Sequence, residues 1–565
     1  MDFKQALAEA LAPAAGMEAA ELSQMLETPP NPEMGDFALP CFRLARTLRK
    51  APPAIAAQLA SEAAFPPFVA RTEVAGGYLN FFLDRATYAR TVMDAVLSQG
   101  ARYGSSDEGA GKTICIDYSS INIAKPFHIG HLSTTVIGHA LYNLFGFLGY
   151  HCVGINHLGD WGTQFGKLIV ALRLWGDRDT IEKGGVREML KIYTRFHEEA
   201  EKDPSLNDAA RAAFKSIEDG DPESLELFHW FRDLTLKEVD RVYQLLGITF
   251  DSYAGESFYN DKMGRVISEL KEKGLLEIDD GASVVRFPEE EHMPPCLILR
   301  SDGATLYATR DIAAALYRKD TYDFYKCLYV VAYQQNLHFR QFFKVIEMMG
   351  YDWAKDLVHV AFGMVSTEEG TLSTRKGKVV FLEEVLQKAI ELTRSIMLEK
   401  NPGLENIDEI SREVGVGAIV FNALSSGRIK DVVFSWDRAL NFDGETGPYC
   451  QYTHARCCSV LQKGGWQPGG DVDYSVLSDP ASLEVVRLLG EFPAAVRSAC
   501  EKYEPSIVTR HVIDLCQAYN KFYLDNRIMG EAPAVQYARL ALTEAARSVI
   551  ATGLNLIGVA APRRM

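Results

Sequence analysis

Two histidines frame an Ile-Gly pair in the stretch INIAKPFHIGHLSTT, which spans residues 121–135 and follows a short apolar run. Apolar residues then recur at intervals of four over 132–148, which predicts a helix that begins at the histidines. The first turn of a helix has backbone N–H groups without intrahelical partners, so it binds anions readily. His128, His131 and Lys125 would add side-chain donors for the oxygens of a phosphate.

The histidine stretch admits two interpretations. Gly130 lacks a Cβ atom, so a flat ring such as adenine could approach the backbone there, which favours a nucleotide site. Alternatively, the two histidines only cap or pack the start of a helix, and Lys125 is a solvated loop lysine.

Two glycine-rich stretches resemble nucleotide-binding loops without fitting them. EGAGKT, at 108–113, precedes the strand that a phosphate-binding loop must follow. GVGAIV, at 415–420, has Val420 where a dinucleotide fingerprint has its last glycine. We interpret its glycines as helix-packing positions.

Length and composition predict a multidomain globular protein. A chain of 565 residues is too long for one core, and its 47% hydrophobic and 24% charged residues are ordinary. There is no apolar run of about 18 residues and no secretory signal, so we expect a cytoplasmic protein without a membrane span. The net charge of -16 argues against a basic coat for non-specific nucleic-acid binding, although it allows a local basic groove. The ten cysteines lack zinc spacing, so we expect reduced thiols and no structural metal.

The pattern along the chain divides it into three expected domains. Residues 1–105 read as a small α+β domain, 106–400 as an α/β domain and 401–565 as an all-helical bundle. In the first we expect a helical start, a Pro-rich turn at 28–40, a helix over 44–50 and a strand over 74–83. In the second, strands at 114–119, 152–158, 296–300 and 327–333 and a helix from 306–317 predict a doubly wound parallel sheet. In the third, the clearest helices are expected at 482–503 and 537–559.

A set of motifs spread over almost the whole chain carries a family resemblance. The first is INIAKPFHIGHL, in which residues 128–131 read HIGH. It is followed along the chain by NHLGDWGTQFGKL, SDGATLYATRDIA, YVVAYQQNLHFRQFF, LSTRKGKVVFLEE and GETGPYCQYTHAR. Together they resemble the arginyl-tRNA synthetases, which are class I aminoacyl-tRNA synthetases. The resemblance implies a Rossmann-type catalytic domain, an N-terminal domain that touches the elbow of the tRNA, and a helical anticodon-binding domain. It also implies a monomer that joins L-arginine to arginine tRNA, with ATP and Mg²⁺, and that needs the tRNA for activation.

The resemblance assigns the ATP site and shows one departure from the family. The implied ATP residues are Lys125, His128, Gly130, His131, Met364 and Val365. The lysine-rich KMSKS loop of class I enzymes is replaced by TLSTRKG, with Thr371 and Thr374 where the lysines would stand. Arg375 and Lys376 lie beside this gap, and we expect Lys125 to take over the phosphate role.

A pocket for a guanidinium should offer carboxylates and hydroxyl or aromatic partners, because a bidentate pair discriminates against the point charge of lysine. The resemblance places these at Asp117, Tyr307 and Asp311, although spacing alone also allows Asp311 to be a helix cap. It assigns the α-amino and carboxylate contacts to Asn122 and Gln335, beside Ser120, Ile121 and His131. Ile121 replaces the proline that is usual in the family.

The helical C-terminal part supplies aromatic and basic residues that could stack on RNA bases or contact phosphates. The expected tRNA-binding residues are Trp436, Tyr449, Tyr452 and Arg456. Aromatic residues in helices are also common in protein cores, so a structural role is the alternative for each.

Three rival functions are distinguished by particular features. A nucleotidylyltransferase has no use for the helical domain at 401–565. A catalytically silent relative would have lost the histidines or the guanidinium pocket. A class I synthetase for another amino acid would not need the acidic pair Asp117 and Asp311.

Overall fold

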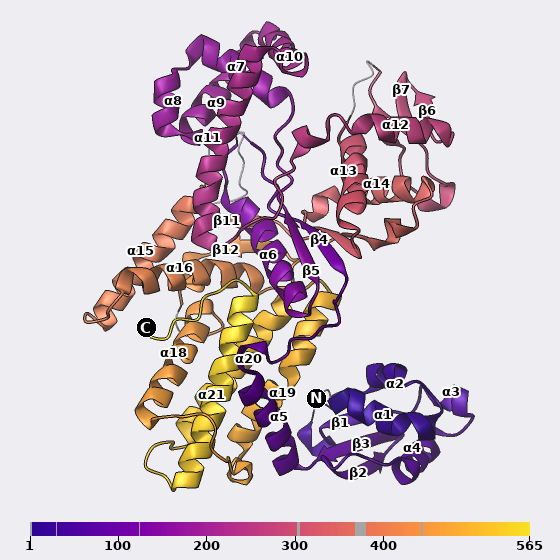
Figure 1. Cartoon of the computed structure of the whole chain (residues 1–565), viewed down its shortest axis with the longest axis vertical. Coiled ribbons are helices and arrows are strands. Elements are labelled where there is room, and N and C mark those ends of the chain that lie inside the picture. Colours follow the sequence, from indigo (N-terminus) through magenta and orange to yellow (C-terminus); the bar gives the residue numbers. More distant parts are fainter. Residues whose placement is uncertain (1–2, 30, 124, 302–305, 368–379, 442–443) are drawn as a thin grey trace.

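The computed structural model describes residues 3–29, 31–123, 125–301, 306–367, 380–441 and 444–565. A parallel sheet lies at the centre, a helical bundle extends from it on one side and two insertions on the other (Figure 1). The N-terminal unit lies apart from the sheet, beside the bundle. None of the helices in the described residues is long and apolar enough to cross a membrane.

The N-terminal unit is a three-stranded antiparallel sheet with helices packed on it. Its strands β1 (Phe37–Pro40), β2 (Val69–Ala75) and β3 (Tyr78–Leu83) are ordered β1-β3-β2, and its main helices are α1 (Phe3–Ala15), α2 (Ala19–Met25) and α4 (Pro52–Glu62). The structure corrects two expectations. The Pro-rich segment ends in strand β1, and 74–83 is a hairpin rather than one strand, because Gly76 and Gly77 turn the chain with φ of 60° and 106°. The basic helix is confirmed only as the short α3 (Ala45–Leu48).

Helix α5 (Arg85–Gln99) follows this unit but packs against the C-terminal bundle, on α19 (Pro480–Glu501) and α21 (Pro533–Leu556). Asp84 caps it by accepting the N–H of Thr87 at 2.8 Å. The predicted boundaries at 105 and 400 stay predictions.

The central sheet has four parallel strands in the order β10-β9-β4-β5. They are β4 (Thr113–Asp117), β5 (His151–Ile155), β9 (Lys326–Tyr329) and β10 (Leu357–His359). Successive residues of β4 face opposite sides, so Ile114 and Ile116 join one core cluster and Cys115 joins another. The chain runs from β4 to β5 on one side and later returns to β9 on the other. The carboxyl ends of β4 and β9 therefore form a topological switch point, the usual place for a ligand.

The chain between β5 and β9 contains two insertions (Figure 1). The first is helical: α7 (Thr163–Trp175), α8 (Arg178–Gly184), α9 (Val186–Lys202), α10 (Ser205–Glu218) and α11 (Pro222–Leu246). The second contains α12 (Met263–Glu272) and the antiparallel sheet of β6 (Glu277–Asp279), β7 (Ala282–Val285) and β8 (Cys296–Leu299). The run at 296–300 is thus a strand, as predicted, but it belongs to this separate sheet. Helices α13 (Tyr307–Tyr322) and α14 (Asn336–Met348) then cover one face of the central sheet.

The C-terminal part is the expected helical bundle. It contains α15 (Leu382–Lys400), α16 (Ile407–Leu424), α18 (Gly447–Gly464) and α20 (Ser506–Asp525) besides α19 and α21. The two helices predicted at 482–503 and 537–559 are confirmed as α19 and α21. Gly415 of α16 lies against the backbone of α15, where an added Cβ atom would be 2.7 Å from the nitrogen of Ile390. The interpretation of this stretch as helix packing is therefore confirmed.

Helix α6 (Leu132–Phe147) packs closely on the segment after β4, which allows a matched stability test. An added Cβ atom at Gly138 would lie 2.2 Å from Cβ of Tyr118, whereas one at Gly146 meets no atom within 4 Å. We expect Gly138→Ala to lower the free energy of unfolding by about 1–3 kcal/mol, because overpacking outweighs the gain in helix propensity. Gly146→Ala should leave it unchanged or raise it by up to about 1 kcal/mol. Urea denaturation measures both, and equal stability of the two variants would contradict the packing.

Candidate active site

The site begins with a strained turn at the carboxyl end of β4. Ser119 and Ser120 have φ of 69° and 38°, in the left-handed region that non-glycine residues rarely occupy. The Ser119 hydroxyl lies 2.9 Å from that of Thr135 and 2.7 Å from that of Tyr243, and the Ser119 N–H donates to Thr134 Oγ1 at 3.0 Å. These contacts with α6 and α11 hold the turn, which directs the following residues across the edge of the sheet.

The histidines form a 3-10 turn, Ile129–His131, that leads into α6, as the sequence predicted. His128 Nδ1 accepts the N–H of Gly130 at 3.1 Å, and His131 Nδ1 accepts the N–H of His128 at 3.3 Å. The histidines therefore do cap the turn. The structure also corrects one expectation, because the N–H of Gly130 is occupied by His128 and is not an open phosphate donor.

Both imidazoles are neutral. Burial and the charge of Lys125 lower the pKa of His128 to about 4, and burial and the neighbouring His128 lower the pKa of His131 to about 3. Since each Nδ1 accepts a backbone N–H, the hydrogen-bond pattern assigns the ring proton to Nε2. The turn thus leaves each ring with one Nε2–H donor beyond the capping bonds, and Lys125 lies close enough to act on both.

The segment that follows the TLSTRKG loop is hydrogen-bonded to the histidine turn. The N–H of Ile129 donates to the carbonyl of Val380 at 3.1 Å, and the N–H of Leu382 donates to the carbonyl of Phe127 at 2.9 Å. Before the loop, β11 (Val365–Thr367) pairs with β12 (Val432–Phe434). The predicted loop residues themselves lie outside the described residues: Thr371, Thr374, Arg375 and Lys376.

The predicted ATP-binding residues Met364 and Val365 lie just before β11 and at its first position, and the backbone of Met364 is engaged. The Met364 N–H donates to Asp431 Oδ1 at 2.7 Å, and its carbonyl accepts the N–H of Val432 at 2.8 Å. The side chain of Met364 is 37% exposed and is open to a ligand.

Asp117, predicted to bind the substrate guanidinium, has two partners within the protein. Its Oδ2 accepts a hydrogen bond from Arg318 of α13 at 2.7 Å, and its Oδ1 accepts one from the Ser120 hydroxyl at 2.6 Å. The Arg318 and Asp117 side chains are only 1% and 7% exposed. The carboxylate expected to bind the substrate guanidinium thus already holds a guanidinium of the protein.

Asp311 is the fifth residue of α13, so it is not a helix cap. Its Oδ2 lies 2.6 Å from Nε2 of His338, and its Oδ1 lies 4.0 Å from Nε2 of His157. Burial favours a raised pKa of Asp311, but the hydrogen bond with His338 and the nearby positive charges outweigh it, and the pKa is lowered. Asp311 is therefore a carboxylate, 28% exposed, at the switch point. Tyr307 begins the same helix and is 68% exposed.

The remaining residues that were predicted to bind the substrate arginine line the same edge of the sheet, but they differ in how exposed they are. Asn122 is exposed opposite Gly159, whereas the Ile121 side chain is buried in the core and its carbonyl accepts the N–H of Gly159 at 2.9 Å. The Ile121 side chain is therefore not available to a ligand, which could contact this residue through its backbone alone. Gln335 is exposed immediately before α14, the helix that carries His338.

Sequence reasoning missed Glu256, which begins the 3-10 turn Glu256–Tyr259 in the loop before α12. Buried Asp160 fixes this loop by accepting the N–H and the hydroxyl of Ser257, each at 2.8 Å. Burial raises the pKa of Glu256 to about 7; Arg310, 3.5 Å away, opposes the rise, and the charge of Asp311 adds to it. A single carboxylate at the start of a four-residue 3-10 turn has no periodic signal, so only the fold reveals that the charge of Asp311 acts on it. His157 and His338 lie within the family motifs, but the sequence alone assigns neither of them a role.

Comparison with known proteins decides the family. The family model "tRNA synthetases class I (R), catalytic domain" matches residues 92–436, over half of the chain. The chain belongs to the arginyl-tRNA synthetases. The "Arginyl tRNA synthetase N terminal domain" and the "DALR anticodon binding domain" match residues 1–83 and 450–565.

Relatives of this arginyl-tRNA synthetase match over full length. The arginine–tRNA ligases of Clostridioides difficile and Alkaliphilus metalliredigens are 55% and 53% identical to it, with 100% of each chain covered. The solved Thermus thermophilus arginyl-tRNA synthetase covers 100% of both chains with a TM-score of 0.80 at 25% identity. The predicted class, class I arginine–tRNA ligase, and the three-part fold are thereby confirmed.

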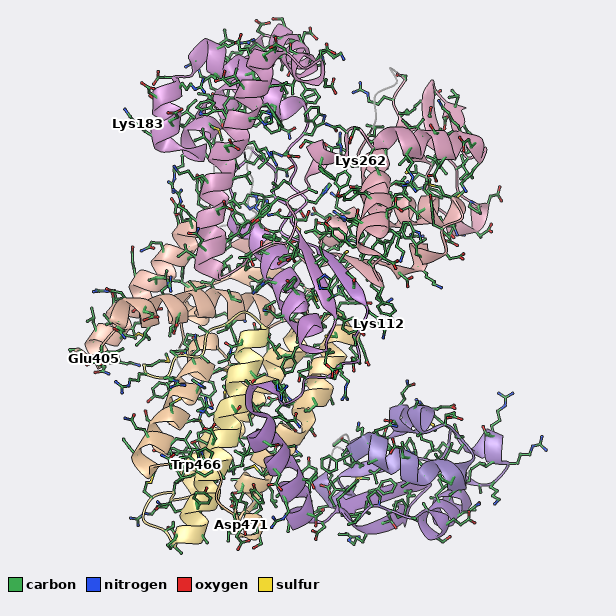
Figure 2. All side chains as sticks on the ribbon, viewed as in Figure 1. Lys112, Lys183, Lys262, Glu405, Trp466 and Asp471 are labelled. Atoms are coloured by element: carbon green, nitrogen blue, oxygen red, sulfur yellow. The ribbon has the colours of Figure 1, made fainter. Side chains whose placement is uncertain are left out.

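The helical part of this synthetase carries a groove of about 970 Å³. Basic and aromatic side chains line it, among them Tyr452, Arg456, Lys463, Tyr523, Arg527 and Arg564. The Arg456 guanidinium lies 5.0 Å from the ring of Tyr452. Glu405, labelled in Figure 2, lies in the connection between α15 and α16 and also lines the groove.

The other two residues predicted to bind tRNA, Trp436 and Tyr449, are not among those that line this groove. Lys388 covers the Trp436 ring at 4.5 Å, and the hydroxyl of Tyr449 accepts a bond from Asn520 at 2.9 Å. Both therefore have structural contacts of the kind that the alternative interpretation expected.

Proposed function

We propose that this arginine–tRNA ligase activates arginine at the carboxyl edge of its parallel sheet, with ATP on the histidine turn and the guanidinium near α13. The observation that carries the proposal is the juxtaposition of two unlike sites. His157 links the two: its backbone N–H donates to the hydroxyl of Ser120, in the segment that leads to the histidine turn, and its Nε2 lies 4.0 Å from Asp311 Oδ1, so a phosphate site of neutral donors adjoins a carboxylate pocket. ATP and arginine must meet in this way to react.

The reaction needs positioning and charge stabilisation rather than a protein nucleophile. An oxygen of the arginine carboxylate attacks the α-phosphorus of ATP, the bond to the bridging oxygen breaks, and pyrophosphate leaves. His128 and His131 donate their Nε2–H groups to phosphate oxygens, and Lys125 supplies the positive charge that the KMSKS lysines supply elsewhere. Arg375 and Lys376 add charge from the loop. ATP enters as its magnesium complex, whose metal neutralises the departing pyrophosphate.

Recognition of arginine divides between two groups of residues. Asp311, Glu256 and Tyr307 receive the guanidinium, since two carboxylates fit its fork of donors better than the single ammonium of lysine. The α-amino and carboxylate groups lie toward Asn122, Gln335 and Ser120. Asp117 acts indirectly, because it holds Ser120 while bound to Arg318.

Glu256 makes arginine binding dependent on pH. Its pKa of about 7 means that raising the pH from 6 to 8 ionises it, and only the carboxylate attracts the guanidinium. We expect the KM for arginine to fall about tenfold over this range, and Glu256→Gln to give a high KM with little pH dependence. Pyrophosphate exchange at a series of pH values measures both. The same pH profile in Glu256→Gln would exclude Glu256 from the pocket.

The rest of the molecule serves tRNA binding in this proposal. The groove at Tyr452 and Arg456 receives bases of the anticodon loop, and the N-terminal domain contacts the elbow of the tRNA. The enzyme works as a monomer in the cytoplasm, where its tRNA is used.

Arginine-dependent exchange of labelled pyrophosphate into ATP, with and without arginine tRNA, tests the proposal. We expect exchange only when arginine and the tRNA are both present. Exchange without tRNA would show that activation of arginine does not depend on tRNA binding. No exchange in either condition, from folded protein that binds ATP, would contradict the proposed site.

A further inference from the structure

His157 has the two nitrogens of its ring in different environments. It follows β5, and its backbone N–H donates to the Ser120 hydroxyl at 3.2 Å. Its Nδ1 lies 3.2 Å from the carbonyl oxygen of Ala254, which can only accept a hydrogen bond. Nδ1 therefore carries the ring proton.

The other nitrogen is then an acceptor. Burial lowers the pKa of His157, so the ring is neutral and Nε2 holds a lone pair. Nε2 lies 4.0 Å from Oδ1 of Asp311, too far for a direct hydrogen bond, and that oxygen is an acceptor as well. Two acceptors at this separation call for a donor between them.

We propose that His157 is a specificity-determining residue, whose Nε2 accepts one N–H of the substrate guanidinium while Asp311 Oδ1 accepts another. The inference rests on the proposed function, which puts the guanidinium at Asp311. Hydrogen bonds of about 2.9 Å can run from one NH₂ nitrogen to two acceptors that are 4.0 Å apart. A neutral acceptor beside a carboxylate adds a hydrogen bond without adding charge.

The surroundings fix both acceptors before the substrate arrives. His338 holds the other oxygen of Asp311 at 2.6 Å, and Ala254 and Ser120 hold His157 by its Nδ1 and its backbone N–H. The Tyr259 ring packs against the imidazole, with centroids 5.5 Å apart. The pair is thus preorganised, which lowers the cost of ordering it on binding.

Two amide substitutions separate the role of each ring nitrogen. The side-chain nitrogen of Asn can take the place of Nδ1 but does not reach the position of Nε2, whereas the longer Gln reaches Nε2. We expect His157→Asn to raise the KM for arginine roughly 10- to 100-fold, as for loss of a hydrogen bond to a charged group. The KM for ATP and the unfolding midpoint should stay close to wild type, and His157→Gln should keep the KM for arginine within about threefold of wild type.

The outcomes are distinguishable by pyrophosphate exchange with arginine tRNA present, with thermal unfolding as the folding check. The reverse order, with His157→Gln impaired and His157→Asn normal, would show that the ring only holds the Ala254 loop. Equal loss in both variants, or loss in neither, would also overturn the inference. Absence of arginine-dependent exchange in the wild type would instead refute the proposed function.

Discussion

Replacing Asp311 with Asn is expected to lower kcat/KM for arginine roughly a thousandfold, or about 4 kcal/mol at 1.4 kcal/mol per tenfold change. The substitution keeps the size of the side chain but removes the charge that a desolvated guanidinium needs. Losing one partner of such a pair costs about 3–5 kcal/mol, because the other charge is left uncompensated. Pyrophosphate exchange at varied arginine concentration measures the effect.

Asp320→Asn on the same helix is the matched control. The Asp320 side chain is 56% exposed and pairs with Arg265 at the surface. Exposed pairs contribute about 0–1 kcal/mol, so this variant should retain activity within about twofold. If Asp311→Asn lost no more activity than Asp320→Asn, the guanidinium would have to bind elsewhere.

Arg318→Met is expected to lower the free energy of unfolding by about 3–5 kcal/mol, because it leaves the buried Asp117 carboxylate without its partner. Arg265→Met is the control, since Arg265 makes ion pairs while 45% exposed, and it should cost at most about 1 kcal/mol. Urea denaturation with and without each substitution gives the comparison.

The double variant Asp117→Leu with Arg318→Met separates stability from function. Replacing both members of a buried pair by apolar residues is often neutral or stabilising, so stability should recover toward wild type. Activity should not recover, because the Ser120 hydroxyl loses the carboxylate oxygen that it binds at 2.6 Å. If Arg318→Met alone were as stable as Arg265→Met, the buried pair would not hold the turn after β4.

Local patterns were sufficient to predict the histidine turn and the helices. The periodic apolar residues after His131 predict α6. Because this pattern begins directly after the histidines, it also places them at the start of the helix. The long helices α19 and α21 are equally evident, since an amphipathic pattern over more than twenty residues has few alternatives. The run at 296–300 shows the limit of such patterns, because the pattern of a short apolar strand does not distinguish a parallel from an antiparallel sheet.

Contacts between distant residues could not be predicted in this way. Arg318 follows Asp117 by 201 positions, and nothing in the spacing of either residue shows that they pair. The same holds for Glu256, whose raised pKa arises from burial and from charges on other elements. The proposed site therefore has one half that is encoded locally, at the histidine turn, and another that the fold assembles, around Asp311 and Glu256.

The acidic net charge and the proposed RNA site are compatible. The chain carries a formal charge of -16, while the groove in the bundle collects Arg456, Lys463, Arg527 and Arg564. A local cluster of this kind attracts phosphates over a distance of about one Debye length, whatever the total charge. Binding there should therefore weaken as salt is raised.

A crystal structure of the protein with a non-hydrolysable arginyl-adenylate analogue would test the central claim most directly. We expect the guanidinium within hydrogen-bond distance of Asp311 Oδ1 and beside Glu256, and the phosphate mimic facing Nε2 of His128 and His131. Asp117 should remain bound to Arg318. A guanidinium that displaced Arg318 from Asp117, or that lay away from Asp311, would contradict the account.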